Sequence, residues 1–140
     1  MTPTEWLVDT NVLVDIINDD PTFAEASILA LEECSRNGIL VINPVIYGEV
    51  GAICDSLEEL DSLLPIETFR RDDLMWEASF LAGQAFRRYR KNKGQKKRVL
   101  ADFLIGAHAS VAGFGLVTRD NGYAKYFQLE LLNPADGIVR

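Results

Sequence analysis

Four carboxylates stand out because each one follows or interrupts an apolar stretch of sequence. They are Asp9 after "WLV", Glu49 within "NPVIYGEV", Asp102 after "VLA" and Asp120 within "VTRDNGY". Carboxylates that meet in one crevice repel one another, and a divalent cation removes that repulsion. Oxygen ligands without a His or Cys cluster favour a hard ion, Mg²⁺ or Mn²⁺. Water bound to such an ion can attack a phosphodiester, so the set predicts phosphodiester hydrolysis without a side-chain nucleophile.

Each acid also has a purely structural explanation. Asp9 could cap the helix that follows it, and Asp102 could cap its own helix or favour its positive end. Asp120 could be a turn residue before an Asn-Gly pair. Glu49 could be paired with a buried arginine, because an unpaired carboxylate on an apolar helix face is costly. Only the four together favour a shared metal site.

Other polar residues are not expected to join this set. His108, the single histidine, is six positions after Asp102 in the same predicted helix. Six residues correspond to about 240° around the axis, so the two side chains do not share a face. We therefore interpret His108 as structural or surface-linked, and one histidine makes Ser-His-Asp or Cys-His catalysis not credible. Asp15 is expected on a solvated helix surface, and the aromatic residues near 123–127 are expected to pack.

The elements that must position the acids alternate along the chain. Short apolar runs predict five strands, at residues 6–9, 39–42, 64–69, 116–118 and 129–132. Helices are predicted at 12–18, 22–37, from Asn43-Pro44 onward, and at 57–63, 72–90, 102–112 and 123–127. Apolar strands separated by helices are typical of a parallel sheet that is covered on both faces.

The predicted fold class is α/β: a three-layer α/β/α sandwich with a parallel five-stranded sheet in the order 3-2-1-4-5. Residues 1–140 are expected to form a single domain of this kind. Strands are then added in opposite directions on the two sides of strand 1. Ligands bind beyond the carboxyl ends of the strands at such a switch point. Because Asp9 ends strand 1 and Asp120 lies just past strand 4, we expect both at one crevice.

Charge is distributed unevenly along the chain. Of the 140 residues, 48% are apolar and 25% are charged, which indicates a globular protein. The net charge of −7 by itself argues against a nucleic-acid partner. Eight of the 14 basic residues nevertheless lie within residues 87–98. A local basic strip can hold a polyanion, and its candidate RNA-contacting residues are Arg87, Arg88, Arg90, Lys91, Lys93, Lys96, Lys97 and Arg98. The alternative is a solvated helix end followed by a mobile loop, "NKGQKKR".

A cytoplasmic location is expected from several absences in the sequence. No stretch approaches the length of a membrane span, and the N-terminus lacks the features of a signal peptide. Cys34 and Cys54, each placed in a predicted helix, are expected to be free thiols rather than a disulfide.

The motifs "LVDTNVLVD", "NPVIYGEV", "ADFLIGAHA" and "LVTRDNGYAKYF" occur in the order and spacing of PIN-domain ribonucleases. More narrowly, the sequence resembles the VapC-type toxins of bacterial toxin–antitoxin pairs over essentially its whole length. The resemblance implies an Mg²⁺- or Mn²⁺-dependent endoribonuclease whose acidic quartet is Asp9, Glu49, Asp102 and Asp120. Asn11 and Thr118 match polar positions that support the site in the family.

The same resemblance implies partners. The family commonly forms homodimers, and its toxins are held inactive by a cognate antitoxin that often presents an arginine to the acids. The sequence departs from the family at the helix before Glu49, which begins with Asn43-Pro44 where many relatives have Ser or Thr. No hydroxyl group from that position is therefore assigned to the site.

Two other functions remain open on the residues alone. The acidic pocket could belong to a non-catalytic binding module that captures a basic, arginine-bearing peptide. The protein could also be a phosphotransfer domain with Asp9 as phospho-acceptor. Phosphatases with an aspartate phospho-acceptor usually have a second Asp two positions later, where this chain has Asn11. In addition, "LVTRD" carries an arginine instead of the required lysine, so the phosphotransfer hypothesis is disfavoured.

Overall fold

The computed structural model describes residues 2–92 and 97–137. A five-stranded parallel sheet in the order β3-β2-β1-β4-β5 forms its centre, which confirms the predicted topology. In β1, Leu7 is in register with Val41 of β2 on one side and with Leu116 of β4 on the other. The strands are β1 (Glu5–Val8), β2 (Ile39–Ile42), β3 (Phe69–Arg71), β4 (Gly115–Val117) and β5 (Leu131–Leu132).

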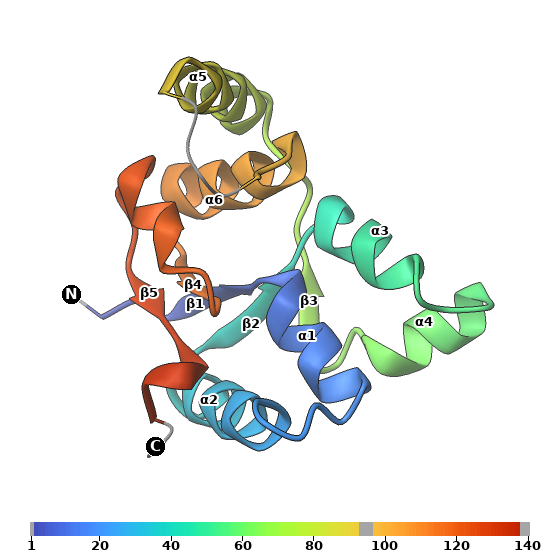
Figure 1. The fold of residues 1–140 in the computed structure, drawn as a ribbon. Coiled ribbons are helices and arrows are strands. Elements are labelled where there is room, and N and C mark those ends of the chain that lie inside the picture. Colours follow the sequence, from blue (N-terminus) through green and yellow to red (C-terminus); the bar gives the residue numbers. More distant parts are fainter. Residues whose placement is uncertain (1, 93–96, 138–140) are drawn as a thin grey trace.

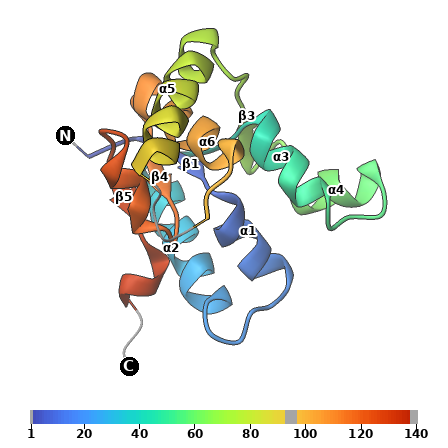
Figure 2. The same ribbon diagram turned by 45° about the horizontal axis from the view of Figure 1, so that its top comes forward.

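Helices cover both faces of this sheet and complete the three layers. Figure 1 shows α6 on one face, with α5 outside it, and α2 on the opposite face. Figure 2 shows α3 and α4 together, on the side of the molecule away from β5. The helices are α1 (Thr10–Ile17), α2 (Ala24–Asn37), α3 (Pro44–Gly51), α4 (Leu57–Leu63), α5 (Trp76–Asn92) and α6 (Leu100–Ala112), with 3₁₀ helices η1 (Asn121–Lys125) and η2 (Pro134–Gly137).

The core lies between the sheet and the flanking helices. The strands β1, β2 and β4 are almost continuously apolar, as expected for strands buried on both faces, whereas β3 contains two arginines. The largest side chains with less than 2% exposure include Leu7, Ile42 and Leu116 from the sheet and Phe103 and Ile105 from α6. Burying each of them contributes roughly 1.5–3 kcal/mol. This packing fixes the ends of β1 and β4, and therefore the position of the polar residues that follow them.

The third strand begins later than predicted. The prediction placed it at residues 64–69, but β3 spans Phe69–Arg71. Leu64 is fully buried as the residue that ends α4, and the carbonyl of Pro65 accepts hydrogen bonds from the amides of Thr68 and Phe69. The predicted strand is therefore a helix end and a turn, in which residues 66–68 are exposed between the buried Leu64 and Phe69.

Other boundaries and one cysteine placement also differ. The long helix was predicted from residue 72, but Asp72 donates its amide to the carbonyl of Ile42 and so continues the sheet, and α5 begins at Trp76. The fifth strand begins at Leu131 rather than at residue 129. Cys34 lies in α2 as predicted, whereas Cys54 lies after the end of α3; both are free thiols. Among the described residues, no helix is long and apolar enough to cross a membrane.

Candidate active site

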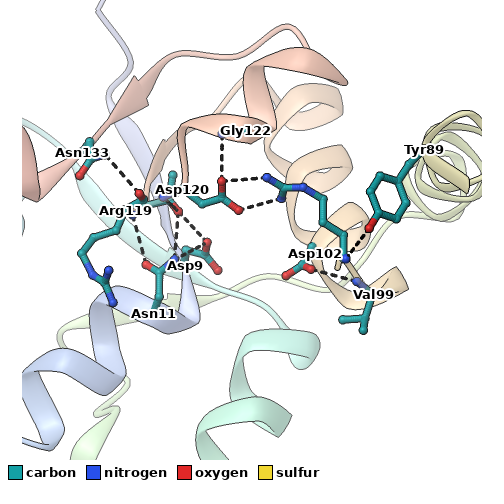
Figure 3. Close-up of polar contacts among 11 residues, drawn as sticks. Asp9, Asn11, Tyr89, Val99, Asp102, Arg119, Asp120, Gly122 and Asn133 are labelled. Carbon is teal, nitrogen blue, oxygen red and sulfur yellow. Dashed lines mark hydrogen bonds and ion pairs between the residues drawn. The ribbon is translucent and has the colours of Figure 1, made fainter. Parts of the chain in front are cut away.

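All four predicted acids line one cavity of about 340 Å³ beyond the carboxyl ends of β1 and β4. Figure 3 shows Asp9, Asn11 and Asp120 grouped together, with Asp102 at the start of α6. The sheet order explains this convergence, because β1 and β4 are the neighbouring parallel strands between which the order of strand addition reverses. The residues that line the cavity are Asp9, Thr10, Asn11, Val14, Asp15, Glu49, Asp102, Arg119, Asp120 and Tyr123.

Asp9 is the most deeply placed of the four acids, with 4% of its surface exposed. One carboxylate oxygen accepts the amide of Thr10 at 2.8 Å, so Asp9 does cap α1. The other oxygen accepts the hydroxyl of Thr118 at 2.7 Å and the side-chain amide of Asn11 at 3.3 Å. The helix cap and a place in the acidic cavity are therefore compatible roles for the same side chain.

Burial raises the pKa of Asp9 from 3.8 to about 6. Hydrogen bonds from Thr118, Thr10 and Tyr123 oppose this increase, and the charge of Asp102 adds to it. Burial, followed by the nearby charges of Asp9 and Asp102, also raises the pKa of Tyr123, which therefore stays protonated. Asp9 is thus a carboxylate whose charged form needs further compensation at neutral pH.

Asn11 and Thr118, the two predicted supporting residues, link the acids to the sheet. The Thr118 hydroxyl, which donates to Asp9, accepts the amide of Asp120 at 3.0 Å and the side-chain amide of Asn11 at 3.3 Å. Asn11 also accepts the backbone amide of Arg119 at 3.2 Å. Asp9 and Asp120 are therefore positioned by the same hydroxyl group, which is fully buried.

Glu49 reaches the cavity from α3. Its carboxylate accepts the hydroxyl of Thr10 at 2.6 Å, which ties α3 to the start of α1. The buried arginine partner that was considered for Glu49 is not found among the described residues, where this hydroxyl is the partner. Asn43 caps α3 as predicted, with Pro44 at its first position, and its side chain accepts the amide of Ile46.

The remaining two acids are held by the segment that precedes α6. Asp102 accepts the amide of Val99 at 3.1 Å, which is the N-terminal capping contact expected of an acid in the first turn. Asp120 accepts two hydrogen bonds from Arg98, at 2.7 and 2.9 Å, and one from the amide of Gly122. The backbone amide of Arg98 in turn donates to the hydroxyl of Tyr89 in α5.

The carboxylate oxygens are of the chemical type that binds a hard divalent cation, but the acids are not gathered around a single point. Among residues 2–92 and 97–137, no three His, Cys, Asp or Glu side chains are close enough to hold a metal ion as they stand. The hydrogen bonds above give the reason: Asp120 faces a guanidinium, Asp102 faces the amide of Val99, and Glu49 faces a hydroxyl.

The predicted basic strip divides into exposed and buried parts. Arg98 has a side chain that is only 9% exposed and is engaged with Asp120, so it does not belong to an open RNA-contacting surface in this arrangement. Lys93 and Lys96, together with most of the predicted mobile loop, lie outside the described residues. The exposed members are Arg87, Arg88, Arg90, Lys91 and Lys97.

Asp15 and Arg119 both line the cavity, although the sequence analysis assigned neither of them to the site. Asp15 was expected on a solvated surface, which is wrong: it is 6% exposed and forms an ion pair with Arg119. Its neighbours in sequence, Val14 and Ile16, are apolar, which is the same feature that indicated a site role for Glu49.

His108 is 1% exposed, and its Nδ1 lies 3.0 Å from the side-chain amide nitrogen of Asn43, which agrees with a structural role.

The chain belongs to the PIN domain family, whose pattern its sequence matches over residues 6–127. Comparison with curated protein sequences gives no significant match. The fold is similar to that of VapBC2 from Rickettsia felis bound to a DNA fragment from their promoter, with a TM-score of 0.71, 22% identity, and coverage of 92% of this chain and 98% of that chain.

Two further structures share the fold. VapBC-1 from nontypeable Haemophilus influenzae gives a TM-score of 0.69 at 17% identity, with 93% of this chain and 98% of that chain covered. Mycobacterium tuberculosis VapC20, described as a Sarcin-Ricin loop cleaving toxin, gives 0.60 at 14% identity, with 88% and 96% covered. At these identities the similarity establishes the fold of this chain.

Proposed function

We propose that this protein is an Mg²⁺- or Mn²⁺-dependent endoribonuclease and the toxin of a toxin–antitoxin pair. The observation that carries the proposal is the cavity of about 340 Å³ that is lined by Asp9, Glu49, Asp102 and Asp120. These acids come from the ends of β1 and β4, from α3 and from the first turn of α6, and they line one cavity although they are far apart in sequence. Membership of the PIN domain family and the similarity in fold to toxin structures support the same conclusion.

In this proposal the four acids hold the cation. A bound Mg²⁺ or Mn²⁺ lowers the pKa of water and neutralises charge on a phosphate. The chain's own residues prepare the site: Thr118 and Thr10 orient Asp9 and Glu49, while the buried position of Asp9 excludes water from one side. Burial raises the pKa of Asp9 to about 6, and a bound cation would favour its charged form.

The first test is cleavage of an RNA pool by the purified protein in EDTA, in Mg²⁺ and in Mn²⁺. Cleavage only with a divalent ion is expected, and equal cleavage in EDTA would contradict metal dependence. Thermal melting provides a second readout, because a cation that binds the folded state raises the melting midpoint. An unchanged midpoint at millimolar Mg²⁺ would count against a site shared by the four acids.

The biological assignments rest on the same proposal. The RNA substrate would approach over the exposed basic residues of α5, and binding would then weaken steeply with salt. A cognate antitoxin, a homodimeric state and a cytoplasmic location follow from the toxin hypothesis. A gene immediately upstream that encodes a small DNA-binding protein would support the pairing, and 5′-end sequencing of RNA after induced expression would identify the target.

The second candidate function is a binding module for an arginine-bearing peptide. It is favoured by the pairing of Asp120 with Arg98, which shows that the acidic site accepts a guanidinium in a two-point contact. Tight peptide binding without nuclease activity in either metal ion would select this alternative. The phosphotransfer hypothesis is weaker, since Asn11 and Arg119 stand where its second Asp and its lysine are required.

A further inference from the structure

Arg119 is held at the acidic cavity by contacts from three other parts of the chain. Its Nε and Nη2 donate to the two oxygens of Asp15 in α1, at 2.5 and 3.2 Å. Its guanidinium carbon lies 4.1 Å from the centroid of the Phe23 ring, just before α2. Its backbone amide donates to Asn11 and its carbonyl accepts from Asn133, as Figure 3 shows.

These contacts orient the guanidinium without burying it. The Asp15 side chain is 8% exposed, whereas that of Arg119 is 29% exposed. Among residues 2–92 and 97–137, no acceptor is found for Nη1, and Asp15 takes one N–H from each of Nε and Nη2. Three of the five guanidinium N–H groups therefore remain for a ligand. The aromatic face and the carboxylate restrict rotation of the side chain, which lowers the entropy lost when a ligand binds.

The guanidinium of Arg119 is a positive charge in a cavity lined mainly by acids. Five carboxylates line the cavity, including Asp15, and Arg119 is the only cationic residue among the described residues of the lining. Arg98, the nearest member of the basic strip, is already engaged by Asp120. Among the charged residues that line the cavity, Arg119 is therefore the one that attracts a phosphate.

We infer that Arg119 binds a backbone phosphate of the RNA at the edge of the acidic cavity, with Asp15 and Phe23 as the residues that position its guanidinium. The inference rests on the proposed nuclease function and adds a substrate-binding residue to it. Arginine suits this role because its planar fork can make two hydrogen bonds to one phosphate. It also separates the roles of the two arginines: Arg98 neutralises a carboxylate, and Arg119 receives the substrate.

The test is the salt dependence of RNA binding, measured in Mg²⁺ with full-length protein carrying Asp102→Asn so that RNA is not consumed. In this background Arg119→Gln is compared with Arg36→Gln, which removes an exposed arginine at the end of α2. For single-stranded RNA, losing one phosphate contact lowers the slope of log K against log salt by about 0.7. Arg119→Gln is expected to show that change and roughly tenfold weaker binding, whereas Arg36→Gln keeps the slope and the affinity.

Arg119→Lys keeps the charge and guards against a folding defect. It is expected to retain the slope while losing part of the affinity, because an ammonium cannot make the two-point contact. If Arg119→Gln lowers the melting midpoint but leaves slope and affinity unchanged, Arg119 is only a tie between β4 and α1, and the inference is overturned. If the protein with Asp102 intact neither binds nor cleaves RNA in Mg²⁺, the proposed function fails, and the inference fails with it.

Discussion

Arg98 and Asp120 form a two-point ion pair at the edge of the acidic cavity, with Nη1–Oδ2 and Nη2–Oδ1 distances of 2.7 and 2.9 Å. The pair leaves little exposed surface on either side chain, 9% for Arg98 and 16% for Asp120. A Cβ atom on Gly122 would overlap Nη2 of Arg98, so a glycine at that position is part of the arrangement. In this arrangement Arg98 supplies the positive charge beside Asp120.

Replacing Arg98 should therefore change both stability and the response to metal. In EDTA, Arg98→Gln is expected to lose about 2 kcal/mol of unfolding free energy, because Asp120 keeps its charge without its main partner. Mg²⁺ is expected to raise the melting midpoint of the variant more than that of the wild type, since Asp120 is then released to act as a ligand. A smaller Mg²⁺ response in Arg98→Gln would show that Arg98 aids metal binding instead of competing with it.

The raised pKa of Asp9 predicts a specific pH dependence of stability in metal-free protein. The folded state binds the proton more tightly than the unfolded state, whose pKa is near 3.8. This contribution to stability is fully present below about pH 3.8 and is lost as the pH rises through about 6. The shift corresponds to about 3 kcal/mol.

Chemical denaturation in EDTA at several pH values between 4 and 7 measures this effect against Asp9→Asn, which cannot titrate. The wild type is expected to lose stability relative to the variant as the pH rises. A constant difference between the two proteins across this range would mean that Asp9 has an ordinary pKa in the folded state.

Close packing of α6 against aromatic residues in and just after η1 predicts an effect at Gly106. A Cβ atom there would lie 2.6 Å from the ring of Phe127 and 2.8 Å from the ring of Tyr123. Gly106→Ala is therefore expected to cost about 1–3 kcal/mol of unfolding free energy. Gly83→Ala is the matched control, because a Cβ atom there meets nothing within 4 Å and Gly83 is exposed in α5. It should stabilise the protein by roughly 0.5–1 kcal/mol; an equal loss in both variants would argue against the packing explanation.

The sequence predicted the sheet order and the location of the acids because both depend on strong, simple patterns. Buried parallel strands are short apolar runs, and the switch between β1 and β4 places Asp9 and Asp120 together. The match to the PIN domain over residues 6–127 confirms the resemblance to PIN-domain proteins that the four motifs indicated. Asp15 was misplaced because a lone helical acid was interpreted as solvated, although apolar residues flank it.

The hydrogen-bonding partners of the acids were not predictable in the same way. Arg98 belongs to a run of basic residues in which nothing distinguishes the one that folds inward. The contact depends on the connection into α6, where Tyr89 fixes the backbone of Arg98. Arg119 is adjacent to Asp120 in sequence, yet its partner Asp15 is 104 residues away. Such pairings arise from tertiary geometry, which local sequence patterns do not encode.

RNA cleavage by matched variants in Mg²⁺ is the most direct measurement of whether the cavity acids are required for hydrolysis. Asp102→Asn removes one cavity carboxylate, and Asp55→Asn makes the same change at an exposed residue between α3 and α4 that does not line the cavity. Even residues that only support metal ligands contribute about 10- to 100-fold, so loss of a ligand should reduce cleavage on the order of a hundredfold or more. Thermal melting verifies that both variants are folded. Asp55→Asn is expected to cleave like the wild type, and Asp102→Asn is not. Undiminished, Mg²⁺-dependent cleavage by folded Asp102→Asn would contradict a role for the cavity acids in hydrolysis.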